Sequence, residues 1–103
     1  MRRRSAVDAN QAAIVAALRA IGATVQPLHM VGAGCPDLLV GFRGRNWCLE
    51  IKDCNASTTD RKLRPAQVDW HGGWKGHVAT VETVGAALAV IGAIDMPIAG
   101  TIR

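Results

Sequence analysis

Apolar residues recur at helical spacing near the start of the chain. Ile14, Val15, Leu18 and Ile21 lie three or four residues apart, which places them on one face of a helix. Asp8 and Gln11 resemble a capping box at the start of this stripe, and a glycine follows its last residue. The pattern predicts a helix over residues 8–22.

Shorter apolar runs, separated by turn residues, predict strands in the middle of the chain. The first is expected over residues 24–30, and Pro27 favours an edge position because proline cannot donate a ladder hydrogen bond. Two more are expected over residues 37–42 and 47–53. The short polar turn between them contains glycine, which predicts an antiparallel hairpin.

The second half of the chain alternates polar and apolar segments. Residues 54–64 are polar and basic and predict a loop. Pro65 is a favourable first helical residue, so a short helix is expected after it. A fourth strand over residues 77–82 and a small helix over 83–93 follow. Helices on a mixed sheet make this an α/β domain with an additional C-terminal helix.

At 103 residues, of which 50% are apolar, the chain fits a single domain spanning 1–103. Residues 1–7 are expected to form a flexible basic arm, and 94–103 a C-terminal tail that the pattern does not place. No apolar run is long enough to span a membrane, and the first residues lack a signal-peptide pattern, so a cytoplasmic protein is expected.

Charge and cysteine content indicate which partners and cofactors to expect. The net charge of +4 favours a polyanion such as nucleic acid. Cys35, Cys48 and Cys54 form no CxxC pair, so neither a disulfide framework nor a zinc site is indicated, and free thiols are expected. No small-molecule cofactor is expected.

The third predicted strand carries the candidate chemistry. Because side chains alternate along a strand, Glu50 and Lys52 share one face and Leu49 and Ile51 the other. Asp37, at the start of the preceding strand, joins the polar face if the hairpin register sets it beside Glu50. Two close carboxylates repel unless a hard divalent cation such as Mg²⁺ lies between them. The alternative is a solvated surface ion pair without function.

Three segments in order resemble a known family. They are residues 32–40 (GAGCPDLLV), 49–53 (LEIKD) and 62–71 (KLRPAQVDWH). The Pro-Asp followed by Glu-Ile-Lys is similar to the motif of the PD-(D/E)XK, or restriction endonuclease-like, nuclease superfamily. The whole set resembles small phage and prophage nucleases of the VRR-NUC kind. The resemblance implies an αβββαβ core and covers most of the chain.

The resemblance also implies roles for individual residues. Asp37 and Glu50 would bind Mg²⁺ or Mn²⁺, with the backbone carbonyl of Ile51 as a third ligand. Lys52 would be the catalytic lysine. Gln67 would support the site or contact the scissile phosphate.

Two positions depart from the pattern of the family. Gln11 stands where many relatives have a glutamate that assists metal binding, and a neutral amide is a weaker ligand. Arg64 stands where relatives often have a threonine that caps the following helix. An arginine side chain cannot accept the backbone hydrogen bond, so a looser helix start is expected.

Further residues have structural and functional interpretations. Trp70 and Trp74 share a helical face and are expected in the core rather than as nucleotide-stacking residues. His71 and His77 are expected to be ordinary histidines. Two basic loops are expected to flank the acidic site and contact DNA. They comprise Arg43, Arg45, Arg61, Lys62 and Arg64.

Together these features predict a Mg²⁺- or Mn²⁺-dependent endonuclease acting on DNA, either structure-selective for branched, flapped or junction forms or weakly sequence-specific. A homodimer is a further hypothesis, because cutting two strands needs two sites. The alternatives are a nucleic-acid-binding protein that retains the fold without cleavage and a structural protein whose Glu50–Lys52 pair is only superficial.

Overall fold

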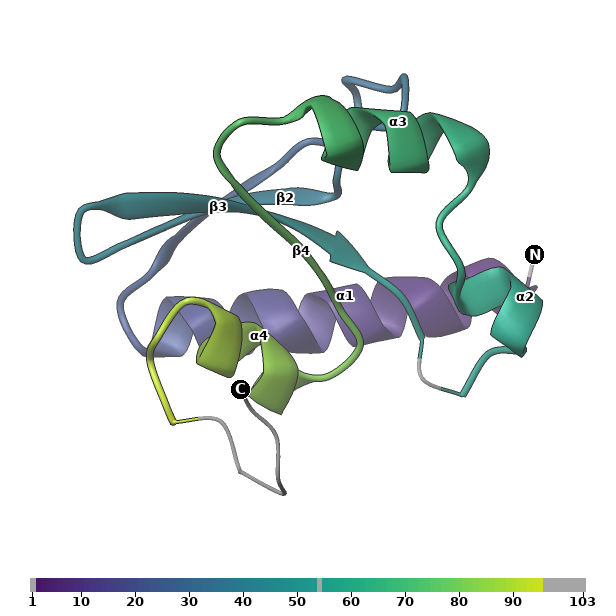
Figure 1. The fold of residues 1–103 in the computed structure, drawn as a ribbon. Helices are drawn as coiled ribbons and strands as arrows, with labels where there is room; N and C mark the ends of the chain where they lie inside the picture. Colours follow the sequence, from purple (N-terminus) through teal and green to yellow (C-terminus); the bar gives the residue numbers. More distant parts are fainter. Residues whose placement is uncertain (1, 54, 96–103) are drawn as a thin grey trace.

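The computed structural model describes residues 2–53 and 55–95, with side chains from residue 9 onward (Figure 1). The expected order of elements is confirmed, with one short helix added. In chain order they are α1 (Arg2–Ala20), β1 (Thr24–Pro27), β2 (Leu38–Phe42), β3 (Arg45–Ile51), α2 (Thr58–Arg61), α3 (Pro65–Gly73), β4 (His77–Val81) and α4 (Val84–Val90).

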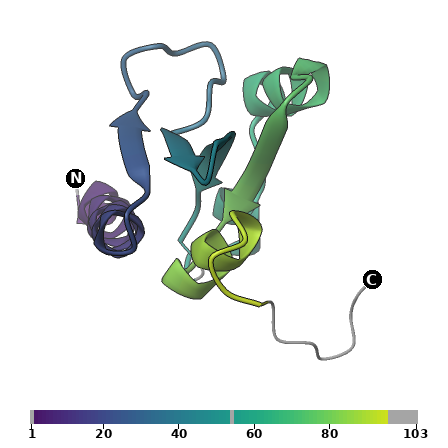
Figure 2. The same cartoon turned by 90° about the vertical axis from the view of Figure 1, so that its left-hand side faces the viewer.

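The four strands form one mixed sheet in the order β1-β2-β3-β4. β1, β2 and β3 are antiparallel neighbours, and β4 runs parallel to β3. Pro27 lies on the edge strand, as expected. Helices α1 and α4 lie on one side of the sheet and α3 lies on the other (Figures 1 and 2). This is the predicted restriction endonuclease-like α/β fold, with α4 as the additional C-terminal helix.

Alternation along β2 and β3 places the core on the α1 side of the sheet, as the sequence predicted. Leu38 and Leu49 are fully buried partners across the hairpin. They pack with Ile14 and Leu18 of α1 and with Ile91, which follows α4. The even-numbered residues of β3 therefore face α3.

The N-terminal segment differs from the prediction. Residues 2–7, expected as a flexible basic arm, belong to α1, because no glycine or proline interrupts the helix before Asp8. The helix ends at Ala20, two residues before the predicted stop at Gly22, whose φ of 91° suits a residue without a Cβ atom. The N–H of Ala23 donates to the carbonyl of Leu18 at 3.1 Å and completes the cap.

Two other segments complete the comparison. Residues 54–64, expected as a loop, contain α2, which begins at Ser57, whose hydroxyl accepts from the N–H of Asp60 at 3.1 Å. Of the predicted tail, 96–103 lies outside the described residues. Within the described residues, no helix combines the length and apolarity that a membrane crossing requires.

The connection between β1 and β2 packs against the start of α3 at Gly34. Its φ is 84°, and a Cβ atom there would collide with the backbone carbonyl of Ala66. Only glycine permits this close approach. The contact fixes the segment before Asp37 against the helical turn that carries Gln67.

We expect Gly34→Ala to destabilise the fold by about 2 kcal/mol or more, because it adds backbone strain and a steric collision. Gly32→Ala is the matched control: its φ is 72°, but nothing lies within 4 Å of the added carbon. It should lose only about 1 kcal/mol from the unfavourable φ. Thermal unfolding measures both, and equal losses would contradict the packing argument.

Candidate active site

Asp37 and Glu50 face each other across the β2–β3 hairpin. The register pairs Leu38 with Leu49, so the preceding Asp37 comes opposite Glu50 on the face away from the core. The N–H of Ile51 donates to Asp37 Oδ2 at 2.7 Å and fixes that carboxylate. The side chain of Ile51 itself points into the core and is 2% exposed.

Lys52 and Gln67 join Glu50 in one polar cluster. The amide Nε2 of Gln67 donates to Glu50 Oε2 at 2.9 Å, and Lys52 Nζ lies 3.5 Å from the same oxygen. Lys52 Nζ also donates to Gln67 Oε1 at 3.2 Å. Gln67 is the third residue of α3, so this helix brings it to the strand pair. The three side chains form a closed triangle of contacts.

Gln67 also supplies a hydrogen bond at the start of α3, where the Arg64 side chain makes none. The Arg64 side chain makes no cap hydrogen bond, as expected of an arginine. Instead the N–H of Arg64 donates to Gln67 Oε1 at 2.8 Å. The same side chain therefore holds the first turn of α3 and contacts the site.

The surroundings of the two carboxylates disfavour their ionised forms. Glu50 is only 4% exposed, and its burial, together with the charge of Asp37, raises its pKa to about 7. Burial also raises the pKa of Asp37, opposed by the Ile51 N–H and by Lys52. Glu50 Oε1 is buried and has no hydrogen-bond partner among the described residues. A bound cation would satisfy this oxygen and offset the repulsion.

The site offers a cation two carboxylates rather than a full side-chain ligand set. Among the described residues, no group of three or more His, Cys, Asp and Glu side chains could hold a metal ion. Backbone or water oxygens would have to complete the coordination. This composition suits Mg²⁺, which prefers oxygen ligands and retains several waters.

Comparison with solved structures shows which known domain this fold resembles. The chain superposes on a "VRR_NUC domain" with a TM-score of 0.65 and 27% sequence identity, covering 82% of this chain and 92% of that one. The chain therefore has the restriction endonuclease-like fold predicted from its sequence and is similar to a VRR-NUC domain. No protein-family model matches it, and a search of curated proteins found no significant match.

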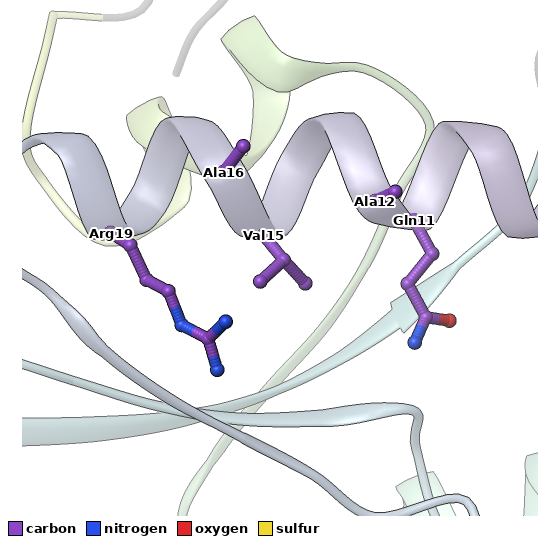
Figure 3. A pocket seen from close by; sticks show the side chains of 5 residues that line it. All are labelled: Gln11, Ala12, Val15, Ala16 and Arg19. Atoms are coloured by element: carbon purple, nitrogen blue, oxygen red, sulfur yellow. The ribbon is translucent and has the colours of Figure 1, made fainter.

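Within the described part of the chain, Gln11 makes no hydrogen bond to Asp37 or Glu50. It projects from the same side of α1 as Val15 and Arg19 and lines a shallow pocket with them (Figure 3). Its neighbour Asn10 contacts the end of β3 instead. Asn10 Nδ2 donates to the carbonyls of Lys52, at 2.9 Å, and of Glu82, at 3.2 Å.

Sequence reasoning missed Asn10, although a signal was present. Asn10 precedes the buried Ile14 by four residues and therefore lies on the same face of α1. A polar residue on a buried helical face needs a hydrogen-bond partner, and here the partners are the carbonyls after β3 and β4. Cys35 was also missed: burial, then the charges of Glu50 and Asp37, raise its thiol pKa. No sequence pattern indicated that proximity.

The two predicted basic loops do not both flank the site. Lys62 and Arg64 are exposed beside the start of α3, and Arg61 Nη1 lies 3.7 Å from Glu82 Oε1. Arg43 and Arg45 occupy the far end of the hairpin. Arg45 precedes Glu50 by five residues, about 17 Å along the strand.

Strand alternation explains this correction. Arg45 shares its face with Trp47 and Leu49, so it lies on the opposite side of the sheet from Glu50. With Arg43 it lines a pocket formed also by residues that follow α4. Any DNA contact there would be separate from the acidic site.

The expectation that Trp70 and Trp74 belong to the core is wrong. Helix α3 has no buried residue, and Trp74 is 47% exposed. The two indoles stack on each other with centroids 4.6 Å apart. The core lies on the other face of the sheet, so no apolar layer packs against α3 and buries the two indoles.

The two histidines differ in environment. His77 is exposed and stacks on Trp47, with ring centroids 5.4 Å apart. His71, on α3, has its pKa lowered by burial and then by the charge of Lys52. Proximity to Lys52 places His71 at the margin of the candidate site.

We expect Glu50→Gln to stabilise the metal-free protein increasingly as the pH rises. The carboxyl pKa is about 7 when folded and 4.5 ordinarily, so the folded chain holds a proton that the unfolded chain has lost. The stability from that proton is complete below pH 4.5 and lost as the pH rises through 7. At pH 8 the variant should melt at least about 4 °C higher, a shift corresponding to about 1 kcal/mol.

Thermal unfolding in EDTA between pH 5 and 8 measures this difference. Glu82→Gln is the control, because that carboxylate is half-exposed and pairs only with the surface residue Arg61 among the described residues. A difference in melting temperature between Glu50→Gln and the unmodified protein that stays constant with pH would refute the raised pKa of Glu50.

Proposed function

We propose that this protein is a metal-dependent endonuclease that hydrolyses DNA phosphodiester bonds with Mg²⁺ or Mn²⁺. The observation that carries the proposal is the cluster in which Asp37 faces Glu50 while Lys52 and Gln67 contact the same Glu50 oxygen. The similarity to a VRR_NUC domain supports a nuclease. The dependence on a metal and the choice of DNA as the substrate go beyond this similarity and belong to the proposal alone.

Asp37, Glu50 and the backbone carbonyl of Ile51 would hold the metal. The unpartnered, buried Glu50 Oε1 is the structural feature that fits a cation there. A bound divalent ion polarises the phosphate and lowers the pKa of a coordinated water. A bound cation would favour the ionised carboxylate and so lower the raised pKa of Glu50.

Lys52 would orient the attacking water and neutralise charge that develops on the phosphate. Its ammonium has three donors, and Glu50 and Gln67 receive two of its contacts. A donor held by fixed partners needs little reorganisation when the transition state forms. Gln67 acts through this arrangement as a positioning residue.

The substrate would be DNA with an irregular structure, or DNA cut with weak sequence preference. Exposed Lys62 and Arg64 lie beside the helix that carries Gln67 and can contact the phosphate backbone. The hairpin arginines lie on the opposite face of the sheet. A second duplex arm of a branched molecule would be needed to engage both.

Activity tests separate the enzyme from a binding protein that retains the fold. Incubation with linear, nicked, flapped and four-way DNA should give cleavage with Mg²⁺ or Mn²⁺ and none with EDTA. Glu50→Ala and Lys52→Ala should each lower the rate by about 10²-fold or more, because each removes a group that acts at the reacting phosphate.

Asp95→Ala is the matched carboxylate control, since Asp95 is exposed after α4, away from the cluster. It should cleave at the unmodified rate. DNA binding without metal-dependent product from any substrate would favour the non-catalytic alternative. Unchanged function in Lys52→Ala would favour a merely superficial ion pair.

Metal binding can be tested without activity. Mg²⁺ or Mn²⁺ at about 100 times its dissociation constant should stabilise the unmodified protein by about 2.7 kcal/mol. Thermal unfolding of Glu50→Gln, which loses one ligand charge, should respond much less to the metal. An equal response from both proteins would place the metal elsewhere.

A further inference from the structure

The stacked indoles of Trp70 and Trp74 form an exposed aromatic surface on α3. Their centroids lie 4.6 Å apart with an interplanar angle of 18°. Although Trp70 stacks on it, Trp74 remains 47% exposed. A large aromatic ring left in water is an unusual feature for a small domain with only four aromatic residues of the Phe, Trp and Tyr types.

The Trp74 ring is also held in place from a second direction. A Cβ atom at Gly76 would come 2.9 Å from Trp74 Nε1, so the indole lies directly against the glycine backbone. A side chain at position 76 would have to displace the indole. The ring is therefore supported by Trp70 and by the turn after α3, and little conformational entropy remains to be lost when a ligand stacks on it.

The position of this surface links it to the candidate active site. Gln67, Trp70 and Trp74 are spaced three and four residues apart, so they follow one face of α3. At 1.5 Å per residue, Trp74 lies about 10 Å along the helix axis from Gln67, about three stacked nucleotide spacings. Gln67 donates to Glu50, so the same helical face joins the acidic cluster to the indoles.

The chemistry of the surroundings favours a nucleic acid over an apolar protein partner. Lys75 adjoins Trp74, and Lys62 and Arg64 precede α3; all three are exposed. Cations beside an aromatic platform suit a phosphate backbone whose bases stack on the rings. Bases within a duplex are already stacked on each other, so only an unpaired base can present its face.

We propose that Trp74, supported by Trp70, is a stacking platform for an unpaired nucleobase of the strand that enters the candidate site. The proposal rests on the nuclease function above and specifies its substrate class. The preferred DNA would carry a single-stranded segment a few nucleotides from the scissile phosphate. Flapped, splayed or junction DNA provides such a segment, whereas a continuous duplex does not.

Binding measured without cleavage tests the platform. The probes are oligo-dT, a flapped duplex and a blunt duplex of equal length, each labelled for fluorescence anisotropy in EDTA. Trp74→Ala should weaken binding to oligo-dT and to the flap by about 10-fold, and more than it weakens duplex binding. Trp74→Phe keeps a stacking ring and should retain most of the affinity.

Val68→Ala is the matched control, because Val68 is an exposed apolar residue of the same helix, 53% exposed, that adjoins Gln67 on a different face. It should bind every probe like the unmodified protein. Oligo-dT should also quench intrinsic tryptophan fluorescence, and most of that quenching should disappear in Trp74→Phe. Circular dichroism confirms that each variant is folded before binding is compared.

Three results would overturn the platform. They are equal losses on flap and duplex, no loss in Trp74→Ala, and conversion of a dimer to a monomer by that substitution, which would make the surface a contact between copies. The two proposals fail separately. Oligo-dT binding that depends on Trp74 without cleavage of any DNA removes the nuclease, while metal-dependent cleavage of flaps at an unchanged rate in Trp74→Ala removes the platform.

Discussion

The burial of Glu50 beside Asp37 is the constraint around which the polar half of this domain is arranged. A carboxylate that is 4% exposed cannot remain ionised cheaply unless its oxygens are paired. Lys52 and Gln67 both contact Oε2, but Oε1 has no partner among the described residues. The fold therefore maintains an incompletely satisfied acidic pair, which is the condition expected of a site that gains stability from a cation.

The position of α3 depends on the same polar contacts. This helix has no buried residue, and its packing against the sheet does not come from an apolar layer. Its first turn is held by Gln67, which contacts Glu50, Lys52 and the N–H of Arg64, and by the close approach of Gly34 to Ala66. Site geometry and helix position consequently determine each other, whereas α1 and α4 are fixed by hydrophobic burial across the sheet.

Alternation along the strands predicted that Glu50 and Lys52 share a face, and that Asp37 joins them if the hairpin register sets it beside Glu50; the register does so. The apolar alternation of Leu38, Val40, Leu49 and Ile51 sets which face is buried, and a one-residue slip would expose all four. That constraint fixes the register, which in turn sets Asp37 opposite Glu50. The same alternation assigns Arg45 to the opposite face. The expectation that Arg45 flanks the acidic site was wrong because it treated the hairpin turn as independent of its strand.

The remaining errors concern features without a periodic apolar signal. Helix α2 and the first turns of α1 contain mostly polar residues, so periodicity could not locate them. Asn10, which hydrogen-bonds the end of β3, and Gln11 differ by about 100° around the helix, so which of them faces the sheet depends on how α1 packs rather than on residue type. The tryptophans were assigned to the core by their hydrophobicity, but the core lies on the other face of the sheet.

Charge balance explains why an acidic site can serve a polyanionic substrate. Asp37 and Glu50, when both are ionised, outweigh Lys52 by one negative charge, so the bare cluster repels a phosphate. A divalent cation held there would reverse that sign and leave one net positive charge at the same place. Lys62, Arg64 and Lys75 lie in the exposed segments around α3 and can hold the backbone beyond the repulsive centre. Asp37 and Glu50 would hold such a cation, and Lys52 with the exposed cations around α3 would attract the phosphate backbone.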